Sequence, residues 1–290
     1  MRGQGSQPAS MGAMEEVATL TLGSVGSVGV AATRVDASIA TATTEQVAVE
    51  LPVALVYNGI SHAVMLATPL DLEDFAMGFS LTEGIIAHPR DVLDIELVQA
   101  SKGKGKGIEV QLTVTQSCLA QLKERRRNLL GRTGCGLCGV DSLEQAVRPI
   151  SQMLVPLDVE LDVLAHTIST AMGRLNKGQP LQQATGAVHS AAFAGIDGQI
   201  VLQREDVGRH NALDKLIGAL AKAKMDTSQG IVLVSSRASY EMVHKAASAG
   251  IPVLAAVSAP TQLAIDTARS AGLTLVGFVR EQRATFYTHF

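Results

Sequence analysis

Aromatic side chains are scarce in this 290-residue chain: tryptophan is absent, and Phe, Trp and Tyr together make up 3% of the sequence. Hydrophobic residues still account for 47%, so the core must be built mainly from Ala, Val, Leu and Ile. Such a core suits stacked helices and buried strands. A chain of this length is long enough for one or two domains with a sizeable core.

An excess of charge of one sign is also missing, since 24 basic and 27 acidic residues give a formal net charge of −3 at pH 7. This balance argues against a general nucleic-acid binder. The chain has three cysteines, too few for a disulfide framework at this length. A reducing cytoplasm is therefore the expected compartment.

Long uninterrupted hydrophobic runs are missing as well. The longest charge-free stretch, residues 246–265, is divided by one glycine and two prolines into a strand, a turn and a helix start, so we expect no membrane span. Residues 1–46 are rich in Gly, Ser, Ala and Thr, and two glutamates interrupt any apolar segment there. We expect no export signal in this stretch, whose composition predicts a disordered or weakly ordered tail.

The first half of the chain predicts a small α+β domain over residues 47–140. Two strand-like segments, residues 51–57 and 60–66, flank Asn58-Gly59, which is the strongest short signal for a β-hairpin. Thr68-Pro69 then offers a helix N-cap followed by an N1 proline. The remaining expected elements are a helix ending near Gly84, strands at 92–98 and 108–114, and a helix at 118–130.

The second half, residues 141–290, predicts an α/β domain. Apolar strands near 231–235, 251–257 and 273–279 alternate with capped helices, a pattern typical of parallel βαβ units with both sheet faces covered. We therefore expect a mixed, largely parallel sheet with helices on both faces, which could recruit strands from the first half. Further helices are expected at 161–175 and 211–224, and a hairpin at Asp197-Gly198.

Ligands collect beyond the carboxyl ends of the strands in such sheets. The residues expected there are Ser235 to Arg237, Ser258 to Thr261 and Arg280 to Arg283. Hydroxyl-rich helix starts with arginines nearby indicate an anion or pyrophosphate site. Helix capping combined with surface charge explains the same residues equally well.

Two of the three cysteines form a CxxC motif, Cys135 and Cys138, with glycine before, between and after them. Glycines permit turns with positive φ and leave the sulfur atoms accessible. A structural core does not require this arrangement, whereas sulfur or metal chemistry does.

Four kinds of chemistry compete for this motif. Structural zinc needs four ligands, but Cys118 is the only further sulfur ligand and no second paired motif occurs. A zinc deaminase would show H-x-E and P-C-x-x-C, and neither is present. A thioredoxin-like dithiol normally opens a helix after the first strand of a small domain. A sulfur-carrying thiolate needs accessibility and a lowered pKa, for which Arg125 to Arg127 and Arg132 could supply positive charge.

Two histidines lie in polar segments, His189 in residues 185–190 and His210 in residues 205–215. The second segment, Glu-Asp-Val-Gly-Arg-His-Asn-Ala-Leu-Asp-Lys, is unusually dense in charge for a plain loop. Internal salt bridging and helix capping explain this density about as well as ligand binding does. Cys118 is best interpreted as a small buried hydrophobic residue.

Taken together, several motifs resemble the formate dehydrogenase accessory sulfurtransferase family, FdhD. They are Asn58-Gly59, Asp71 to Ile86, Gly134 to Gly139, Glu205 to Lys215 and Ser236 to Val243. The resemblance extends from about residue 47 to the end of the chain. Two departures, Ala187 and Ser236, each replace a glycine of the family pattern by a small residue.

The resemblance implies a cytoplasmic, homodimeric sulfur carrier of the sulfurtransferase class. Such a protein would take persulfide sulfur from a cysteine desulfurase and deliver it to the bis-molybdopterin guanine dinucleotide cofactor of molybdenum or tungsten before insertion into formate dehydrogenase. It also implies a cytidine deaminase-like larger domain without zinc. Guanine nucleotide would be a surrogate ligand, and neither a membrane nor nucleic acid is an expected partner.

The resemblance also implies roles for particular residues. Cys135 would carry the persulfide and Cys138 would assist, either as a second acceptor or as a resolving thiol. Arg237 would join the cofactor-binding segment, which comprises Phe278, Val279, Arg280, Glu281, Gln282 and Arg283. The alternative is a non-catalytic chaperone that binds cofactor and target enzyme, with the CxxC motif as a structural or redox clip.

Overall fold

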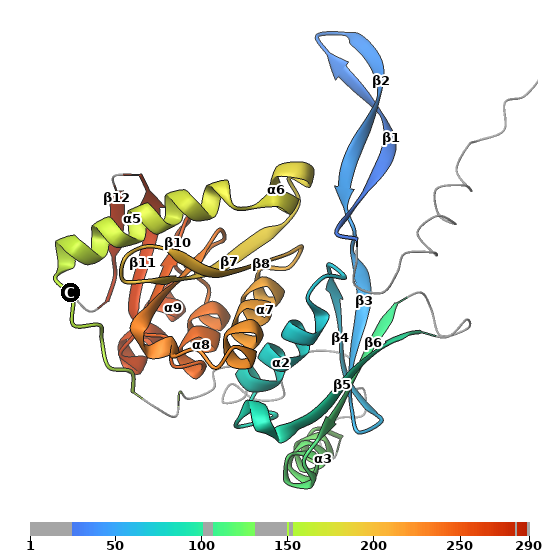
Figure 1. Ribbon diagram of the computed structural model, residues 1–290, viewed down its shortest axis with the longest axis vertical. Helices are drawn as coiled ribbons and strands as arrows, with labels where there is room; N and C mark the ends of the chain where they lie inside the picture. The colour runs from blue at the N-terminus through green and yellow to red at the C-terminus, as the bar shows by residue number, and fades with distance from the viewer. Residues whose placement is uncertain (1–24, 101–106, 131–149, 151–152, 282, 289–290) are drawn as a thin grey trace, which may run out of the picture.

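The computed structural model describes residues 25–100, 107–130, 150, 153–281 and 283–288, and for residues 125–130 it describes the backbone alone. Figure 1 shows a four-stranded sheet beside a larger six-stranded sheet with its helices, and a long β-hairpin that projects beyond both. Within the described residues, no helix combines the length and apolar character needed to cross a bilayer.

The first half of the chain forms the four-stranded sheet, in the order β4-β3-β6-β5. Its strands are β3 (Leu51–Tyr57), β4 (Ile60–Ala67), β5 (Val92–Gln99) and β6 (Ile108–Val114). The predicted hairpin is present, and Asn58 and Gly59 take the positive φ values, 46° and 80°, that its two-residue turn requires. Helices α2 (Leu72–Thr82) and α3 (Gln116–Leu130) complete this half and contribute apolar residues to one core with the sheet.

The second half forms a mixed sheet in the order β12-β11-β10-β9-β7-β8. Its strands are β7 (His189–Gly195), β8 (Ile200–Asp206), β9 (Gly230–Val234), β10 (Val253–Ala256), β11 (Thr274–Arg280) and β12 (Arg283–Phe286). Strands β9, β10 and β11 are parallel to one another, as the βαβ pattern predicts.

The other strand pairs correct the expectation of a largely parallel sheet. Strand β7 is antiparallel to both of its neighbours, and β12 is antiparallel to β11. A tight turn at Asp197-Gly198 reverses β7 into β8, and β12 folds directly back onto β11. The mixed α/β class is confirmed, but no described strand of the first half joins this sheet.

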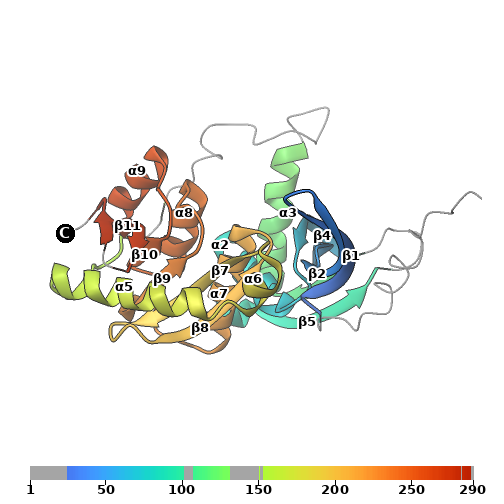
Figure 2. The same cartoon turned by 90° about the horizontal axis from the view of Figure 1, so that it is seen from above.

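Helices lie along the two faces of the six-stranded sheet (Figure 2). Helices α7 (Arg209–Lys222), α8 (Tyr240–Ser248) and α9 (Gln262–Ala271) pack on one face, whereas α5 (Leu161–Lys177) packs on the other. Alternate strand residues serve the two cores: Val232 and Leu254 face α7–α9, whereas Ile231 and Val253 face α5. This two-residue period, filled with aliphatic side chains, is how a chain poor in aromatics builds a dense core.

The two halves are joined by a close crossing of helices α2 and α7. A Cβ atom placed on Gly78 would lie 1.8 Å from the carbonyl oxygen of Asp214, and one on Gly218 would lie 1.9 Å from that of Asp74. Both distances are well inside van der Waals contact, so the two backbones can approach this closely only with glycine at these positions.

Gly218→Ala is therefore expected to lower the free energy of unfolding by about 1–3 kcal/mol, because the added methyl group forces α2 and α7 apart. Chemical denaturation followed by far-ultraviolet circular dichroism measures this change. Gly173→Ala on α5 is the matched control, because a methyl group added there would have no atom within 4 Å of it. This variant should be as stable as the native protein or more so, since alanine favours a helix over glycine by about 1 kcal/mol. Equal stability of the Gly218→Ala variant and the native protein would contradict the crossing.

The structure differs from the expected tail over part of residues 1–46. Strands β1 (Ser27–Asp36) and β2 (Ile39–Ala48) form an antiparallel hairpin, and the intervening Ala37 and Ser38 take positive φ. Val and Thr recur along both strands and favour extended backbone, but the Gly- and Ser-rich residues before them dominate the average composition. The hairpin leaves Val35 and Ile39 64% and 70% exposed.

Candidate functional site

The loops that follow β9 and β10 pair with each other at the edge of the sheet where β9, β10 and β11 end, which we call the carboxyl edge. Ala238 N donates to the carbonyl oxygen of Ala259 at 3.3 Å, and Thr261 N donates to that of Ala238 at 3.1 Å. Ser258 N likewise donates to the carbonyl oxygen of Ser236. The predicted convergence of Ser235–Arg237, Ser258–Thr261 and the end of β11 at one edge is confirmed.

Strained backbone marks the end of β11 at this edge. Phe278 has φ 52°, and the pairing with β12 shifts register between Gly277 and Arg280. Phe278 N donates to the carbonyl oxygen of Ser258 at 3.3 Å, which ties this bulge to the loop after β10. A non-glycine residue in the left-handed region is held there only when its surroundings determine it, and such positions cluster at functional sites.

The three arginines of the predicted cofactor site are all exposed at or beside the carboxyl edge. The Arg280 guanidinium turns back on the backbone, since its Nη1 donates to the carbonyl oxygens of Val257 at 2.6 Å and Val279 at 2.9 Å. Arg237 precedes the N-terminus of α8 by three residues, and Arg283 begins β12. The chain therefore brings these positive charges to the edge without an ion pair among the described residues.

The other predicted site residues differ in whether they are exposed, buried or outside the described residues. Val279 is 1% exposed and belongs to the core, whereas Glu281 is exposed. Cys135, Cys138 and Gln282 lie outside the described residues. Cys118 is a free thiol, 7% exposed, that packs among the apolar residues of the first half, as its interpretation as a small hydrophobic residue requires.

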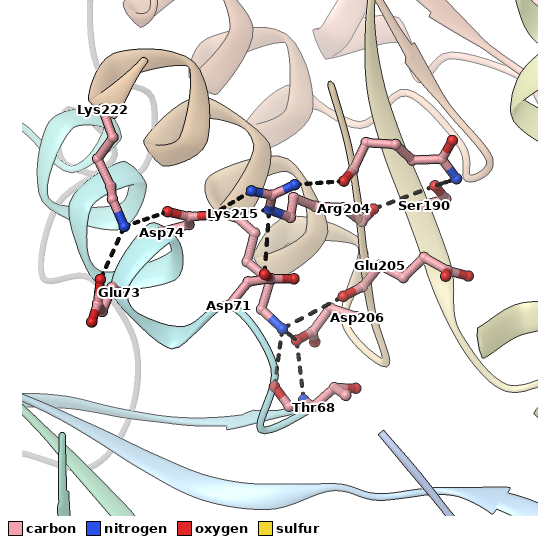
Figure 3. A network of polar contacts seen from close by, with 11 residues as sticks. Thr68, Asp71, Glu73, Asp74, Ser190, Arg204, Glu205, Asp206, Lys215 and Lys222 are labelled. Carbon is pink, nitrogen blue, oxygen red and sulfur yellow. Dashed lines mark hydrogen bonds and ion pairs between the residues drawn. The ribbon is translucent and has the colours of Figure 1, made fainter. Parts of the chain in front are cut away.

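The segment 205–215 contains a buried ion pair between Lys215 and Asp206, whose side chains are both 0% exposed and 2.6 Å apart (Figure 3). Lys215 Nζ also donates to the carbonyl oxygen of Thr68 at 2.9 Å, and Thr68 N donates to Asp206 Oδ2 at 3.0 Å. Asn211 Nδ2 donates to Asp206 Oδ1 and to the carbonyl oxygen of Leu66. We call Thr68, Asp206, Asn211 and Lys215 the Lys215 cluster; it joins the end of β4 to β8 and α7.

This cluster corrects the predicted role of Thr68. Asp71, with φ 53°, is the N-cap of α2, whereas Thr68 is fully buried and its hydroxyl accepts from Val207 N. Burial lowers the pKa of Lys215 more than its attraction to Asp206 raises it. Of the explanations considered for the charge of this segment, internal salt bridging therefore accounts for Asp206 and Lys215.

Two further ion-pair groups connect the halves. Arg204 Nη2 lies 2.7 Å from Asp74 Oδ2, and Lys222 Nζ lies 2.9 Å from Asp74 Oδ1 (Figure 3). Lys245 on α8 pairs with Asp214 at 2.9 Å and with Glu83 at 3.2 Å. Burial alone would lower the pKa of Lys245, but the two carboxylates outweigh it and raise the pKa.

A cavity of about 480 Å³ lies between the base of the hairpin, α6 (Pro180–Thr185) and β8. Its charged groups are already engaged: Arg204 binds Asp74 and lies 3.6 Å from Asp71, and the Glu205 carboxylate accepts from the backbone N of Leu181 and Gln182 at 3.1 and 2.9 Å. Within the described residues, no group of three or more His, Cys, Asp or Glu is arranged to hold a metal ion.

Comparison with known proteins identifies the family to which this chain belongs. Residues 48–290 match the model of the FdhD/NarQ family, and the chain belongs to that family. The resemblance found in its motifs is thereby confirmed.

Relatives in two bacteria carry the name sulfur carrier protein FdhD. The one from Cupriavidus necator is 57% identical over 247 residues, covering 84% of this chain and 82% of the relative. The one from Bordetella petrii is 53% identical over 245 residues, covering 84% and 85%. A crystal structure of a formate dehydrogenase accessory protein from Desulfotalea psychrophila superimposes with a TM-score of 0.67 at 22% identity, covering 91% of this chain and 97% of that one, and so supports the fold.

Proposed function

We propose that this protein is a sulfur carrier that takes persulfide sulfur from a cysteine desulfurase. It transfers this sulfur to the bis-molybdopterin guanine dinucleotide cofactor of molybdenum or tungsten, its substrate, before the cofactor enters formate dehydrogenase. We further propose that it acts as a cytoplasmic homodimer. Membership of the FdhD/NarQ family and the name of its relatives support this role. The observation that carries it is the glycine-flanked pair Cys135 and Cys138 in the sequence.

Loading proceeds by thiol–persulfide exchange. The Cys135 thiolate attacks the outer sulfur of the donor persulfide, the donor S–S bond breaks, and the donor cysteine leaves as a thiolate with the electron pair. The product is Cys135–S–SH, with the proton still on the outer sulfur. The attacking species must be the thiolate, so positive charge from nearby arginines in the sequence would favour this step.

Release uses Cys138 as a resolving thiol. Its thiolate attacks Sγ of Cys135, which forms the Cys135–Cys138 disulfide and expels the outer sulfur as hydrosulfide. The outer sulfur gains two electrons and the two cysteine sulfurs lose one each. Hydrosulfide then replaces an oxygen ligand of the substrate metal, which leaves as hydroxide, so the oxidation state of the metal does not change. A cellular dithiol reductant then reduces the disulfide and restores both cysteines.

The carboxyl edge is the site that we propose for the cofactor. Arg237, Arg280 and Arg283 are exposed there, and the strained segment at Phe278 is tied to the loop after β10. Arginine suits phosphate because its guanidinium donates several charge-assisted hydrogen bonds in one plane. Ligand sites in open α/β sheets lie at this edge, which supports the assignment.

Arg283→Ala and Arg280→Ala are each expected to weaken binding of guanosine diphosphate about tenfold or more, because each removes a charge-assisted contact worth roughly 1.5–3 kcal/mol. Isothermal titration calorimetry measures the change, and persulfide loading of the same variants should be unaffected. Arg269→Ala is the control, since Arg269 is exposed at the C-terminal end of α9, at the opposite edge of the sheet. Unchanged nucleotide affinity in both edge variants would rule out this cofactor site.

A labelled-sulfur experiment separates the carrier from the chaperone alternative. The protein is incubated with a cysteine desulfurase and ³⁵S-cysteine, and protein-bound label that a thiol reductant releases is counted. A carrier acquires about one reductant-labile sulfur per Cys135. A chaperone whose CxxC motif serves only as a clip acquires none, and that result would refute the carrier.

A further inference from the structure

Three buried side-chain atoms in the described part of the chain lack a hydrogen-bond partner, and all three belong to neighbouring residues at one place. They are Arg209 Nε, His210 Nε2 and Ser239 Oγ. Leaving a buried polar group unsatisfied costs about 1–3 kcal/mol, and native proteins contain few such groups. Their concentration at one place indicates groups arranged for a ligand.

These residues lie where two helices begin at the carboxyl edge. Strand β8 runs parallel to β9, through the antiparallel β7 between them, so α7 and α8 both start at the edge where β9 ends. Arg209 and His210 open α7, whose N-cap is Gly208, and Ser239 is the N-cap of α8 but makes no side-chain capping hydrogen bond. Two helix N-termini thus direct partial positive charge toward the same place.

Among the described residues Arg209 has no ion pair within 4 Å, and Asp206, three residues before it, is already paired with Lys215 at 2.6 Å. Burial first, and then the positive charge of Arg209, lower the pKa of His210 to about 4. Burial and Arg209 also lower the pKa of His189. Arg209 therefore lies close enough to both histidines for its charge to disfavour their protonation.

Glu241 is the acidic group at this place. Its Oε2 lies 3.9 Å from His210 Nε2, beyond hydrogen-bonding distance, and its side chain is 55% exposed. Burial raises the pKa of Glu241, but its own amide, the Ser239 hydroxyl and the nearby His210 and Arg209 side chains outweigh burial and lower it. The Ser239 hydroxyl is thus close to Glu241 without completing a hydrogen bond. The solvent-exposed Glu241 lies at the rim of the site.

We infer that Arg209, His210 and Ser239 form a binding site for a phosphoryl group, which we call the α7–α8 site. Arg209 Nε is always a donor, so the missing partner must be an acceptor, and phosphoryl oxygens accept from arginine, imidazole, hydroxyl and helix N-termini alike. His210 is 31% exposed, so the ligand enters beside Glu241 as these side chains rotate. The identification of the phosphoryl group as the diphosphate of a guanine nucleotide rests on the proposed function, whereas the site itself does not.

The test measures binding of inorganic pyrophosphate, guanosine diphosphate and guanosine to the full-length protein by isothermal titration calorimetry. Arg209→Gln and Ser239→Ala should each weaken pyrophosphate and guanosine diphosphate binding, by about tenfold for Arg209→Gln. Glu241→Gln should strengthen both roughly fivefold, because it removes a negative charge from the rim. Arg269→Gln on α9 is the control and should change neither.

Stability separates a ligand site from a structural role. Arg209→Gln and Ser239→Ala remove unsatisfied groups, so their melting temperatures should equal or exceed that of the native protein even as binding weakens. The inference would be overturned by unchanged affinity in both variants, or by native protein that binds neither phosphoryl probe. If the affinity of both variants is unchanged, guanosine diphosphate still binds elsewhere and the proposed function stands. Pyrophosphate binding that depends on Arg209, without any binding of guanosine diphosphate, would support the site and count against the proposed nucleotide-bearing substrate.

Discussion

Cys135→Ala should leave formate dehydrogenase as inactive as it is in a strain without this protein. The substitution removes the only atom that can carry the persulfide in the proposed mechanism, and the neighbouring thiol cannot replace it, because its role is to attack Sγ of Cys135. Binding of guanosine diphosphate should stay within about twofold of the native value, since the proposed cofactor site draws on other residues. The measurements are formate oxidation in the complemented strain and calorimetric titration of the purified variant.

The other two cysteines provide the controls. Cys138→Ala should still acquire labelled sulfur but release it slowly without added thiol, so formate dehydrogenase activity should fall without the loss of loading. Cys118→Ala should retain activity, because Cys118 is buried and packs with apolar neighbours. Active formate dehydrogenase in a strain that carries only Cys135→Ala would refute the mechanism outright.

Lys215→Met is expected to lower the free energy of unfolding by about 3–5 kcal/mol, because it leaves the Asp206 carboxylate buried without its counter-charge. Both side chains are 0% exposed in the native protein, so solvent cannot compensate. Equilibrium urea denaturation followed by far-ultraviolet circular dichroism measures the loss, a suitable method because the chain has no tryptophan.

Two comparisons make this prediction specific. Lys222→Met removes an ion pair in which the lysine is 41% exposed, and it should change stability by about 1 kcal/mol or less. The double variant Lys215→Met/Asp206→Leu should recover much of the lost stability, since apolar residues can replace a buried pair at little net change. Losses of equal size in Lys215→Met and Lys222→Met would show that burial of the Lys215 cluster is unimportant.

Sequence patterns predicted the elements whose signals are local. Asn58-Gly59 fixes a hairpin turn because both residues tolerate positive φ, and the β9–β11 strands with their helices follow from apolar runs separated by capping residues. The convergence of Ser235–Arg237 and Ser258–Thr261 followed from the rule that parallel strands end at one edge. The Lys215 cluster did not follow, because Thr68 and Asp206 are 138 residues apart in the chain.

The segment 205–215 shows why sequence reasoning left its role open. A helix places neighbouring residues on different faces, so this one segment serves two purposes. Asp206, Asn211 and Lys215 face the first half of the chain, whereas Arg209 and His210 lie toward α8 and Glu241. The density of charge in the sequence could reveal the segment. Only the direction of each side chain distinguishes the residues that stabilise the fold from those that could bind a ligand.

The distance along the chain between α2 and its partner also affects synthesis of the protein. Glu73 on α2 and Lys222 on α7, which pair with each other, are separated by 149 residues, which a ribosome adds in roughly 7 to 30 s. During that time the face of α2 that contains Asp74, Gly78 and Leu81 has no helix to cover it. We therefore expect newly made chains to be most prone to aggregation, and most dependent on general chaperones, before α7 leaves the ribosomal exit tunnel.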